Sequence, residues 1–355
     1  MPRMLKLLPV ACALAALLAP RAPAALARQG EPDPQFEHAL AAYRKGDFKG
    51  AVKEFRSVVK RRQDDPLAWV YLGQALARRG ELKDARKAFD AALRLKPDYA
   101  IAHTSVAYLL MVSGKEREAE AELTKAAGLA PELPDTHYVL GLLRLRQEAW
   151  LKALEEAEAV NRLDPNFASA YSLKTQALLG LYDRGNVVLS EERRGVYDYD
   201  DATVAEARAA QPRRLKEASE SLAEYLRLRP DADDAGELRE QVETLRAYAE
   251  AAASDDPLRK IYGSADGITR AVITYKPEPG YTEEARNANI SGAVRLRAVL
   301  GADGTVKHIF VLRRLSHGLT EKAVQAARQI RFKPATLDGH PVSQFVVLEY
   351  YFNVY

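Results

Sequence analysis

The chain has 355 residues, of which 47% are hydrophobic and 28% charged, a globular balance that predicts two or three domains. Residues 1–27 carry three basic side chains and no acidic one, so 49 basic and 49 acidic residues remain after them. A net charge of zero excludes a general electrostatic attraction to nucleic acid. The only cysteine, Cys12, also lies in residues 1–27, which excludes disulfides, thiolate chemistry and cysteine metal ligands from the remainder.

Residues 1–27 have the pattern of a secretory signal peptide. Arg3 and Lys6 precede an apolar run at residues 7–19, and Ala25-Leu26-Ala27 offers small side chains for cleavage. The alternative is a retained inner-membrane anchor. Thirteen helical residues span only about 20 Å, against a hydrocarbon core of about 30 Å. Cleavage and a periplasmic location are therefore expected, with membrane contact only if this segment is uncleaved.

A period of 34 residues follows. Pro97, Pro131 and Pro165 keep this step, as do Ala85, Ala119 and Ala153. A fixed period of this size indicates stacked supersecondary units. The clearest unit contains Trp69, Leu72, Gly73, Leu76, Ala85, Phe89, Ala92 and Pro97. This pattern resembles the tetratricopeptide repeat (TPR), which implies an α-solenoid of antiparallel helical hairpins.

The array is expected over residues 28–254, as five hairpins and a capping helix at residues 235–253. An insertion at about residues 181–212 interrupts the fifth hairpin and is interpreted as a solvated loop with one short helix. Its aspartates at 198, 200 and 201 lack the spacing, glycine and distal glutamate of a calcium-binding EF-hand loop. No metal site is expected there.

In TPR proteins the first helix of each hairpin lines a concave groove, where an extended or helical peptide binds. The resemblance assigns ten residues to this partner-binding face: Gln74, Arg78, Thr104, Tyr108, Met111, Tyr138, Leu142, Arg146, Ser172 and Gln176. Tyr108 and Tyr138 are expected to contribute to binding and little to stability. The alternative is that this face is only solvated or packs on the C-terminal part of the chain.

After a linker at residues 255–267 the pattern changes to alternating strands. Strands are expected at residues 268–275, 293–300, 305–313 and 343–355, with a capped helical turn at residues 282–286 and a helix at residues 319–330. The turn between the second and third strands is Gly301-Ala302-Asp303-Gly304, a hairpin signal.

Residues 268–355 resemble the C-terminal domain of TonB-family proteins. The residues that carry this likeness are Tyr281, Glu284-Ala285-Arg286, Gly292-Ala293-Val294, Ala302 to Val306, Ala323, Ala327, Phe332 to Ala335 and Gly339 to Val342. The resemblance implies a small α+β domain in which helices cover one face of a three-stranded antiparallel sheet.

In that family the last strand is an edge that accepts the TonB box of an outer-membrane transporter by strand addition. The corresponding residues here are Lys276, Tyr281, Val346, Val347, Leu348, Glu349, Tyr350, Tyr351 and Phe352. The alternative is that the chain's own residues 268–275 already cover this edge, as native proteins protect exposed strands.

The sequence contains no phosphate-binding loop, nucleophile elbow or zinc-protease motif, so no catalysis and no cofactor are expected. His103 and His137 share one repeat position and are interpreted as packing residues. The favoured function is a non-enzymatic adaptor of the cell envelope that binds other envelope proteins, with an outer-membrane transporter segment as a candidate partner. The alternatives are a membrane-anchored TonB-type energy transducer and a peptidoglycan-associated scaffold.

Overall fold

The computed structural model describes residues 33–193, 200–232, 234–263 and 267–353. The predicted signal peptide lies outside the described residues. By its internal contacts the chain divides at residues 173 and 174 into two compact units. Each unit is described on its own below.

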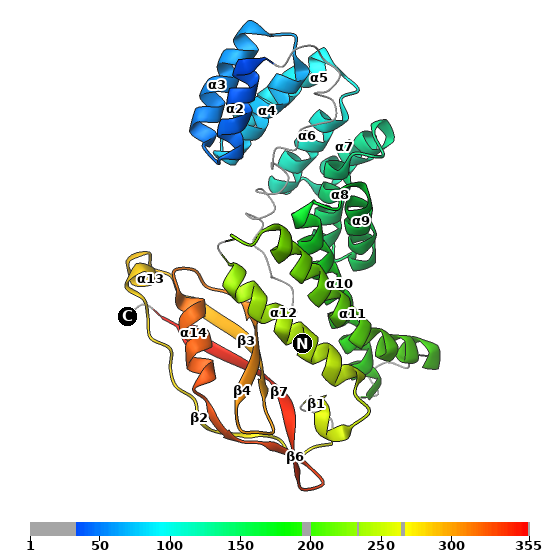
Figure 1. Ribbon diagram of the computed structural model, residues 1–355, viewed down its shortest axis with the longest axis vertical. Helices are drawn as coiled ribbons and strands as arrows, with labels where there is room; N and C mark the ends of the chain where they lie inside the picture. The colour runs from blue at the N-terminus through cyan, green and yellow to red at the C-terminus, as the bar shows by residue number, and fades with distance from the viewer. Residues whose placement is uncertain (1–32, 194–199, 233, 264–266, 354–355) are drawn as a thin grey trace. The chain divides into compact units, whose positions relative to one another are not determined.

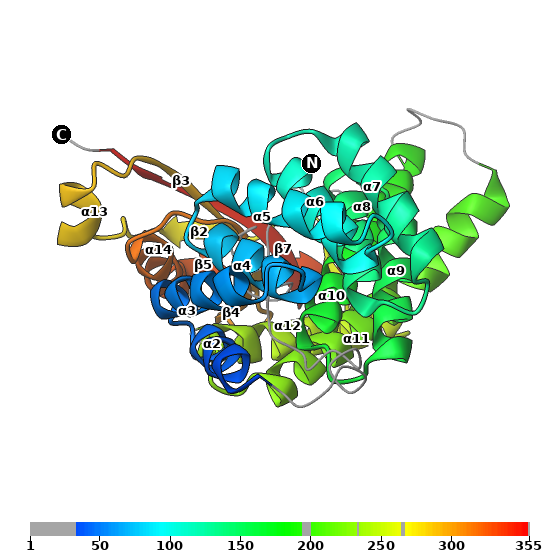
Figure 2. The same ribbon diagram turned by 90° about the horizontal axis from the view of Figure 1, so that it is seen from above.

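The first unit consists of helical hairpins (Figures 1 and 2). The hairpins are α2 (Pro34–Arg44) with α3 (Phe48–Arg61), α4 (Pro66–Arg78) with α5 (Leu82–Leu95), α6 (Ala100–Val112) with α7 (Glu116–Leu129), and α8 (Pro134–Arg146) with α9 (Trp150–Leu163). The prolines of the 34-residue period each lie two residues after the end of α5, α7 or α9. This placement fits a residue that cannot continue a helix.

The recurring small residues of this unit lie in tightly packed positions. Ala85, Ala119 and Ala153 are each completely buried. A Cβ atom added to Gly73 would lie 2.4 Å from the Phe89 ring, so only a glycine permits this approach of α4 and α5. The sequence-based assignment of the hairpins is confirmed.

The second unit begins within α10 (Ala168–Arg193) and continues with α11 (Asp201–Leu228) and α12 (Ala235–Ala253). The predicted loop at residues 181–212 is wrong where the structure describes it, because both helices of the fifth hairpin extend into that segment. The extensions bind each other: Gln211 donates to the Tyr182 carbonyl (3.2 Å) and Arg214 to the Leu181 carbonyl (3.1 Å). Asp200 caps α11 by accepting from the Thr203 amide (2.8 Å).

A mixed β-sheet follows in the same unit. Its strands are β1 (Ile261–Tyr262), β3 (Gly292–Leu300), β4 (Val306–Arg313), β6 (Ala335–Leu337) and β7 (His340–Phe352). Their order is β1-β7-β3-β4, with β6 also paired to β7. The antiparallel trio β7-β3-β4 is the expected three-stranded sheet. A separate ribbon pairs β2 (Val272–Tyr275) with β5 (Arg331–Lys333).

Helices cover one face of the sheet as expected. The helix α14 (Leu319–Arg328) buries Ala323 and Ala327 against Leu296 of β3 and Leu348 of β7. The short helix α13 (Glu283–Asn287) is capped by the Thr282 hydroxyl, which accepts from the Ala285 amide (3.2 Å). The short helical turn η2 (Pro257–Arg259) leads from α12 into β1.

The predicted capping helix is present as α12, and it partly covers the opposite face of the sheet, a contact that the sequence did not predict (Figure 1). Tyr248 donates its hydroxyl proton to the His308 carbonyl of β4 (2.9 Å), and its ring meets Phe345 of β7 edge-on at 4.8 Å. Two ion pairs flank this contact: Glu237 with Arg314, and Glu240 with Arg328 (2.6 Å). The helix that ends the hairpin array is thus also part of the C-terminal core.

Candidate interaction surfaces

The residues assigned to the TPR groove divide by burial. Five of them are only 2–5% exposed: Thr104, Tyr108, Met111, Tyr138 and Ser172. Gln74, Arg78, Leu142 and Gln176 are half-buried, and Arg146 is exposed. Tyr108 and Tyr138 belong to the hydrophobic core of the first unit. The expectation that these two tyrosines contribute little to stability is therefore revised.

Several polar groups on this face bind residues of the array itself. The Thr104 and Thr136 hydroxyls lie 2.7 Å apart, and Arg146 donates to Glu116 at 2.9 Å. The Arg78 guanidinium lies 4.1 Å from the centre of the Phe48 ring. A ligand in the groove would therefore compete with contacts between hairpins, and the partner-binding role of these residues stays a prediction.

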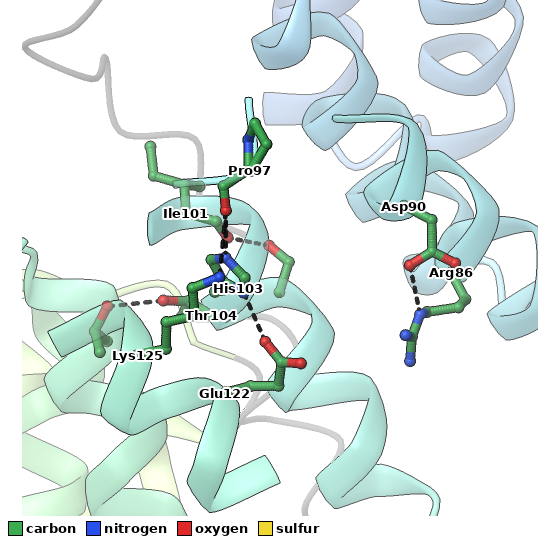
Figure 3. Close-up of polar contacts among 10 residues, drawn as sticks. Arg86, Asp90, Pro97, Ile101, His103, Thr104, Glu122 and Lys125 are labelled. Atoms are coloured by element: carbon green, nitrogen blue, oxygen red, sulfur yellow. Dashed lines mark hydrogen bonds and ion pairs between the residues drawn. The ribbon is translucent and has the colours of Figure 1, made fainter. Parts of the chain in front are cut away.

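A histidine joins the two helices of a hairpin at the same position in two successive repeats. His103 of α6 lies 2.6 Å from the Glu122 carboxylate of α7 and 2.8 Å from the Pro97 carbonyl (Figure 3). His137 makes the same two contacts, with Glu156 and with the Pro131 carbonyl, each at 2.8 Å.

For His137 these contacts favour the protonated ring. A carboxylate and a carbonyl only accept, so a ring placed between them donates from both nitrogens only as an imidazolium. The hydrogen bond to Glu156 raises the pKa of His137 accordingly. Within the described ranges, no group of three histidine, cysteine or acidic side chains is arranged to hold a metal ion.

The second candidate surface is the edge of β7 that faces away from β3. Residues 344–352 of β7 pair with β3 on the inner side. On the other side β1 pairs only with Ser343 and Gln344, and β6 only with residues 340–342. From Phe345 to Phe352, none of the described strands pairs with this outer edge.

Residues 268–275, the alternative cover predicted for this edge, lie beside β7 without pairing with it as a strand. β2 forms its main-chain ladder with β5, with Val272 opposite Lys333. The residues that flank β2 make two hydrogen bonds to β7: the Lys276 ammonium donates to the Glu349 carbonyl (2.7 Å), and the Ala271 amide donates to the Gln344 side-chain oxygen (2.8 Å). The edge is therefore neither fully open nor covered by a paired strand.

The bond from Lys276 indicates how the main chain of β7 is oriented. We infer that the Glu349 carbonyl points away from β3, because main-chain groups of a strand alternate between its two neighbours. The main-chain amides and carbonyls of Val347 and Tyr351 then point away from β3 as well.

The side chains of β7 alternate between the two faces of the sheet. Leu348, Tyr350 and Phe352 lie in the core under α13 and α14, and Val346 packs against it. Val347 is 47% and Tyr351 65% exposed on the opposite face. Glu349 lies between them, where it accepts from the Tyr351 hydroxyl (2.7 Å) and pairs with Arg295 (3.3 Å).

Lys276 and Tyr281 flank this edge. The Lys276 ammonium lies 4.5 Å from the centre of the Tyr350 ring, and burial raises the pKa of Tyr350 to about 12. The Tyr281 ring meets Phe352 edge-on at 5.8 Å, and its hydroxyl donates to the Ile290 carbonyl. Tyr281 therefore supports the end of β7 from within the domain.

Sequence reasoning missed Gln344 and the residues of α12. Gln344 is 3% exposed on the core face of β7, where its neighbours Val342 and Leu348 are apolar. A polar residue at an apolar position of the alternation is a signal that could have indicated its bond to Ala271. In the part of the chain that the structure describes, no helix combines the length and apolar character that a membrane span needs.

Comparisons with known proteins agree with both resemblances. A tetratricopeptide repeat model matches residues 36–100, and the model of the Gram-negative bacterial TonB protein C-terminal domain matches residues 277–354. Among curated proteins, no significant match to the sequence exists.

Solved structures with similar folds are TPR proteins. MamA from Desulfovibrio magneticus RS-1 is 18% identical over 57% of this chain and 98% of its own, with a TM-score of 0.35. Pseudomonas aeruginosa PilF is 18% identical over 58% of this chain and 95% of its own, with a TM-score of 0.36. PilW, described as a type IV pilus biogenesis factor, is 17% identical over 59% and 90%, with a TM-score of 0.39. At these scores the likenesses support no inference about this chain.

Proposed function

We propose that this chain, which contains tetratricopeptide repeats and a TonB C-terminal domain, is a non-catalytic adaptor of the cell envelope. In this proposal the helical array binds one protein, and the outer edge of β7 accepts an extended segment of another. An outer-membrane transporter segment is the partner that the TonB resemblance favours. The match to a Gram-negative TonB domain fits an envelope location, and export to the periplasm would follow from the predicted signal peptide.

The observation that carries the proposal is the state of the β7 edge. From Phe345 to Phe352 none of the described strands pairs with it, and two of its outward residues, Val347 and Tyr351, expose large side chains. An added strand would gain main-chain hydrogen bonds at Val347, Glu349 and Tyr351, while alternate side chains would provide specificity. Natural proteins usually blunt or cover such edges, so an edge left unpaired supports a binding role.

The second candidate is a membrane-anchored energy transducer. It requires that residues 1–27 remain in the inner membrane, and these residues lie outside the described part of the chain. Fractionation with N-terminal sequencing separates the two: a released protein that begins at Arg28 contradicts the transducer. A peptidoglycan-associated scaffold would instead cosediment with purified peptidoglycan.

The adaptor function is tested by capture from an outer-membrane extract with the full mature chain. The wild type is compared with Val347→Pro, which removes one outward amide from the edge. We expect the wild type to retain specific proteins that the folded proline variant loses. Identical retention by both folded proteins would contradict strand addition at β7.

A further inference from the structure

The segment between Thr269 and Lys276 lies along β7 in a way that bears on access to the edge. Its two bonds to β7 join Ala271 to Gln344 and Lys276 to Glu349, so the contacts lie five residues apart on both segments. Equal spacing in the same order means that the segment runs parallel to β7.

This segment is held more firmly on its other side. The amides and carbonyls of Thr269 and Thr336 exchange two hydrogen bonds of 2.9 Å, and β2 then pairs with β5 through Val272 and Ile273. Towards β7 the described residues of this segment form no ladder, and its hydrogen bonds to that strand include those of Ala271 with the Gln344 side chain and of the Lys276 side chain with Glu349. One side is thus fixed by main-chain pairing, and the other by two separable polar contacts.

The Lys276 contact occupies a group that a partner strand needs. Strand addition to β7 uses the outward carbonyl of Glu349, and the Lys276 ammonium already binds this oxygen at 2.7 Å. Lys276 is itself exposed, so its release does not open the core. The side chains of Val272, Ile273 and Tyr275 are also exposed, which leaves apolar surface beside the edge.

We propose that residues 269–276 form a latch that lowers the affinity of the β7 edge for a partner strand, with Lys276 as its releasable contact. This inference rests on the proposed function of the same edge. A partner then binds only molecules in which Lys276 has left the Glu349 carbonyl. The apparent affinity falls in proportion to the fraction of open molecules.

The test uses the full mature chain and two substitutions of exposed lysines. Lys276→Met keeps the aliphatic stem and loses the ammonium, whereas Lys333→Met on β5 makes the same change of charge away from Glu349. Hydrogen exchange of residues 269–276 reports the latch without any ligand. A fluorescent, end-capped heptapeptide of alternating threonine and valine is the strand probe, and a version with proline in place of valine is its control.

We expect Lys276→Met to exchange faster at residues 269–276 and to bind the threonine–valine peptide about 3- to 10-fold more tightly, because more molecules are open. Lys333→Met should match the wild type in both measurements. Unchanged exchange in Lys276→Met would overturn the latch, and so would weaker peptide binding, which would make Lys276 a ligand contact.

Two further outcomes separate this inference from the function on which it rests. Equal binding by the wild type and Lys276→Met would leave strand addition standing and contradict the latch. Faster exchange with no binding of the peptide by any variant would contradict both strand addition at β7 and its regulation.

Discussion

The helical hairpins of residues 33–173 and the sheet of residues 261–352 differ in whether equivalent positions have equivalent surroundings. In the hairpins, one position has the same environment in successive repeats, as His103 and His137 show with their matching carboxylate and carbonyl partners. In the sheet, the two edges of the single strand β7 differ. The inner edge pairs with β3 along nine residues, and most of the outer edge pairs with none of the described strands.

The two regions differ in how much of their candidate binding surface is buried. The repeats bury their recurring positions, and even the tyrosines assigned to the groove, Tyr108 and Tyr138, are almost fully buried. In the sheet, none of the described strands pairs with the outer edge of β7 from Phe345 to Phe352, and the Lys276 side chain binds the Glu349 carbonyl there. Under the proposed function, substitutions at this edge should alter binding with little effect on stability, whereas substitutions of the buried groove residues should affect both.

The largest effect is expected where the sheet depends on α12. Tyr248 is 1% exposed and joins α12 to both β4 and β7. Tyr248→Ala should lower the free energy of unfolding of the C-terminal unit by about 3–5 kcal/mol, the usual cost of truncating a buried aromatic residue. Urea unfolding measures this loss. Tyr351→Ala is the control for stability, since its ring is largely exposed, and an equal loss in both variants would mean that α12 does not support the sheet.

A smaller loss is expected from overpacking a hairpin. Leucine at Gly73 would collide with the Phe89 ring, and we expect it to cost about 1–3 kcal/mol. Gly128 in α7 has open space around its Cα, so Gly128→Leu should be neutral or stabilise the helix by up to about 1 kcal/mol. Thermal melts of the two variants compare them directly. Equal melting temperatures would contradict the assigned contact between α4 and α5.

Much of the hairpin region could be predicted because its contacts are local and recur every 34 residues. The strands β3, β4 and β7 were predicted within a few residues from their alternation. The helical extensions near Tyr182 and Gln211 were not, since their bonds join residues 29 apart and leave no periodic signal. The contacts of Tyr248 with His308 and of Lys276 with Glu349 join residues 60 and 73 apart, which no local pattern contains.

The contacts of His137 predict that the stability of the hairpins depends on pH. The pKa of His137 is raised in the folded protein, chiefly by its hydrogen bond to Glu156. A raised folded pKa means that this stabilisation is complete below the ordinary histidine pKa and is lost as pH rises through the folded value. We expect His137→Gln to destabilise the protein by on the order of 1 kcal/mol at pH 5.5 and by less at pH 9.

Melting temperatures at the two pH values measure this change. His340→Gln, at the exposed start of β7, is the matched control and should behave alike at both. A destabilisation by His137→Gln that stays constant with pH would show that the ring acts by packing rather than by charge.

The two edges of β7 differ in their pairing, and separate proline substitutions at two adjacent positions test this difference. Val347→Pro removes an outward amide, whereas Leu348→Pro removes one that bonds to β3. The measurement is the melting temperature of each variant together with its affinity for the threonine–valine heptapeptide. We expect Val347→Pro to keep the wild-type melting temperature and lose peptide binding, and Leu348→Pro to lower the melting temperature. Undiminished binding by a folded Val347→Pro, or equal destabilisation by both prolines, would contradict it.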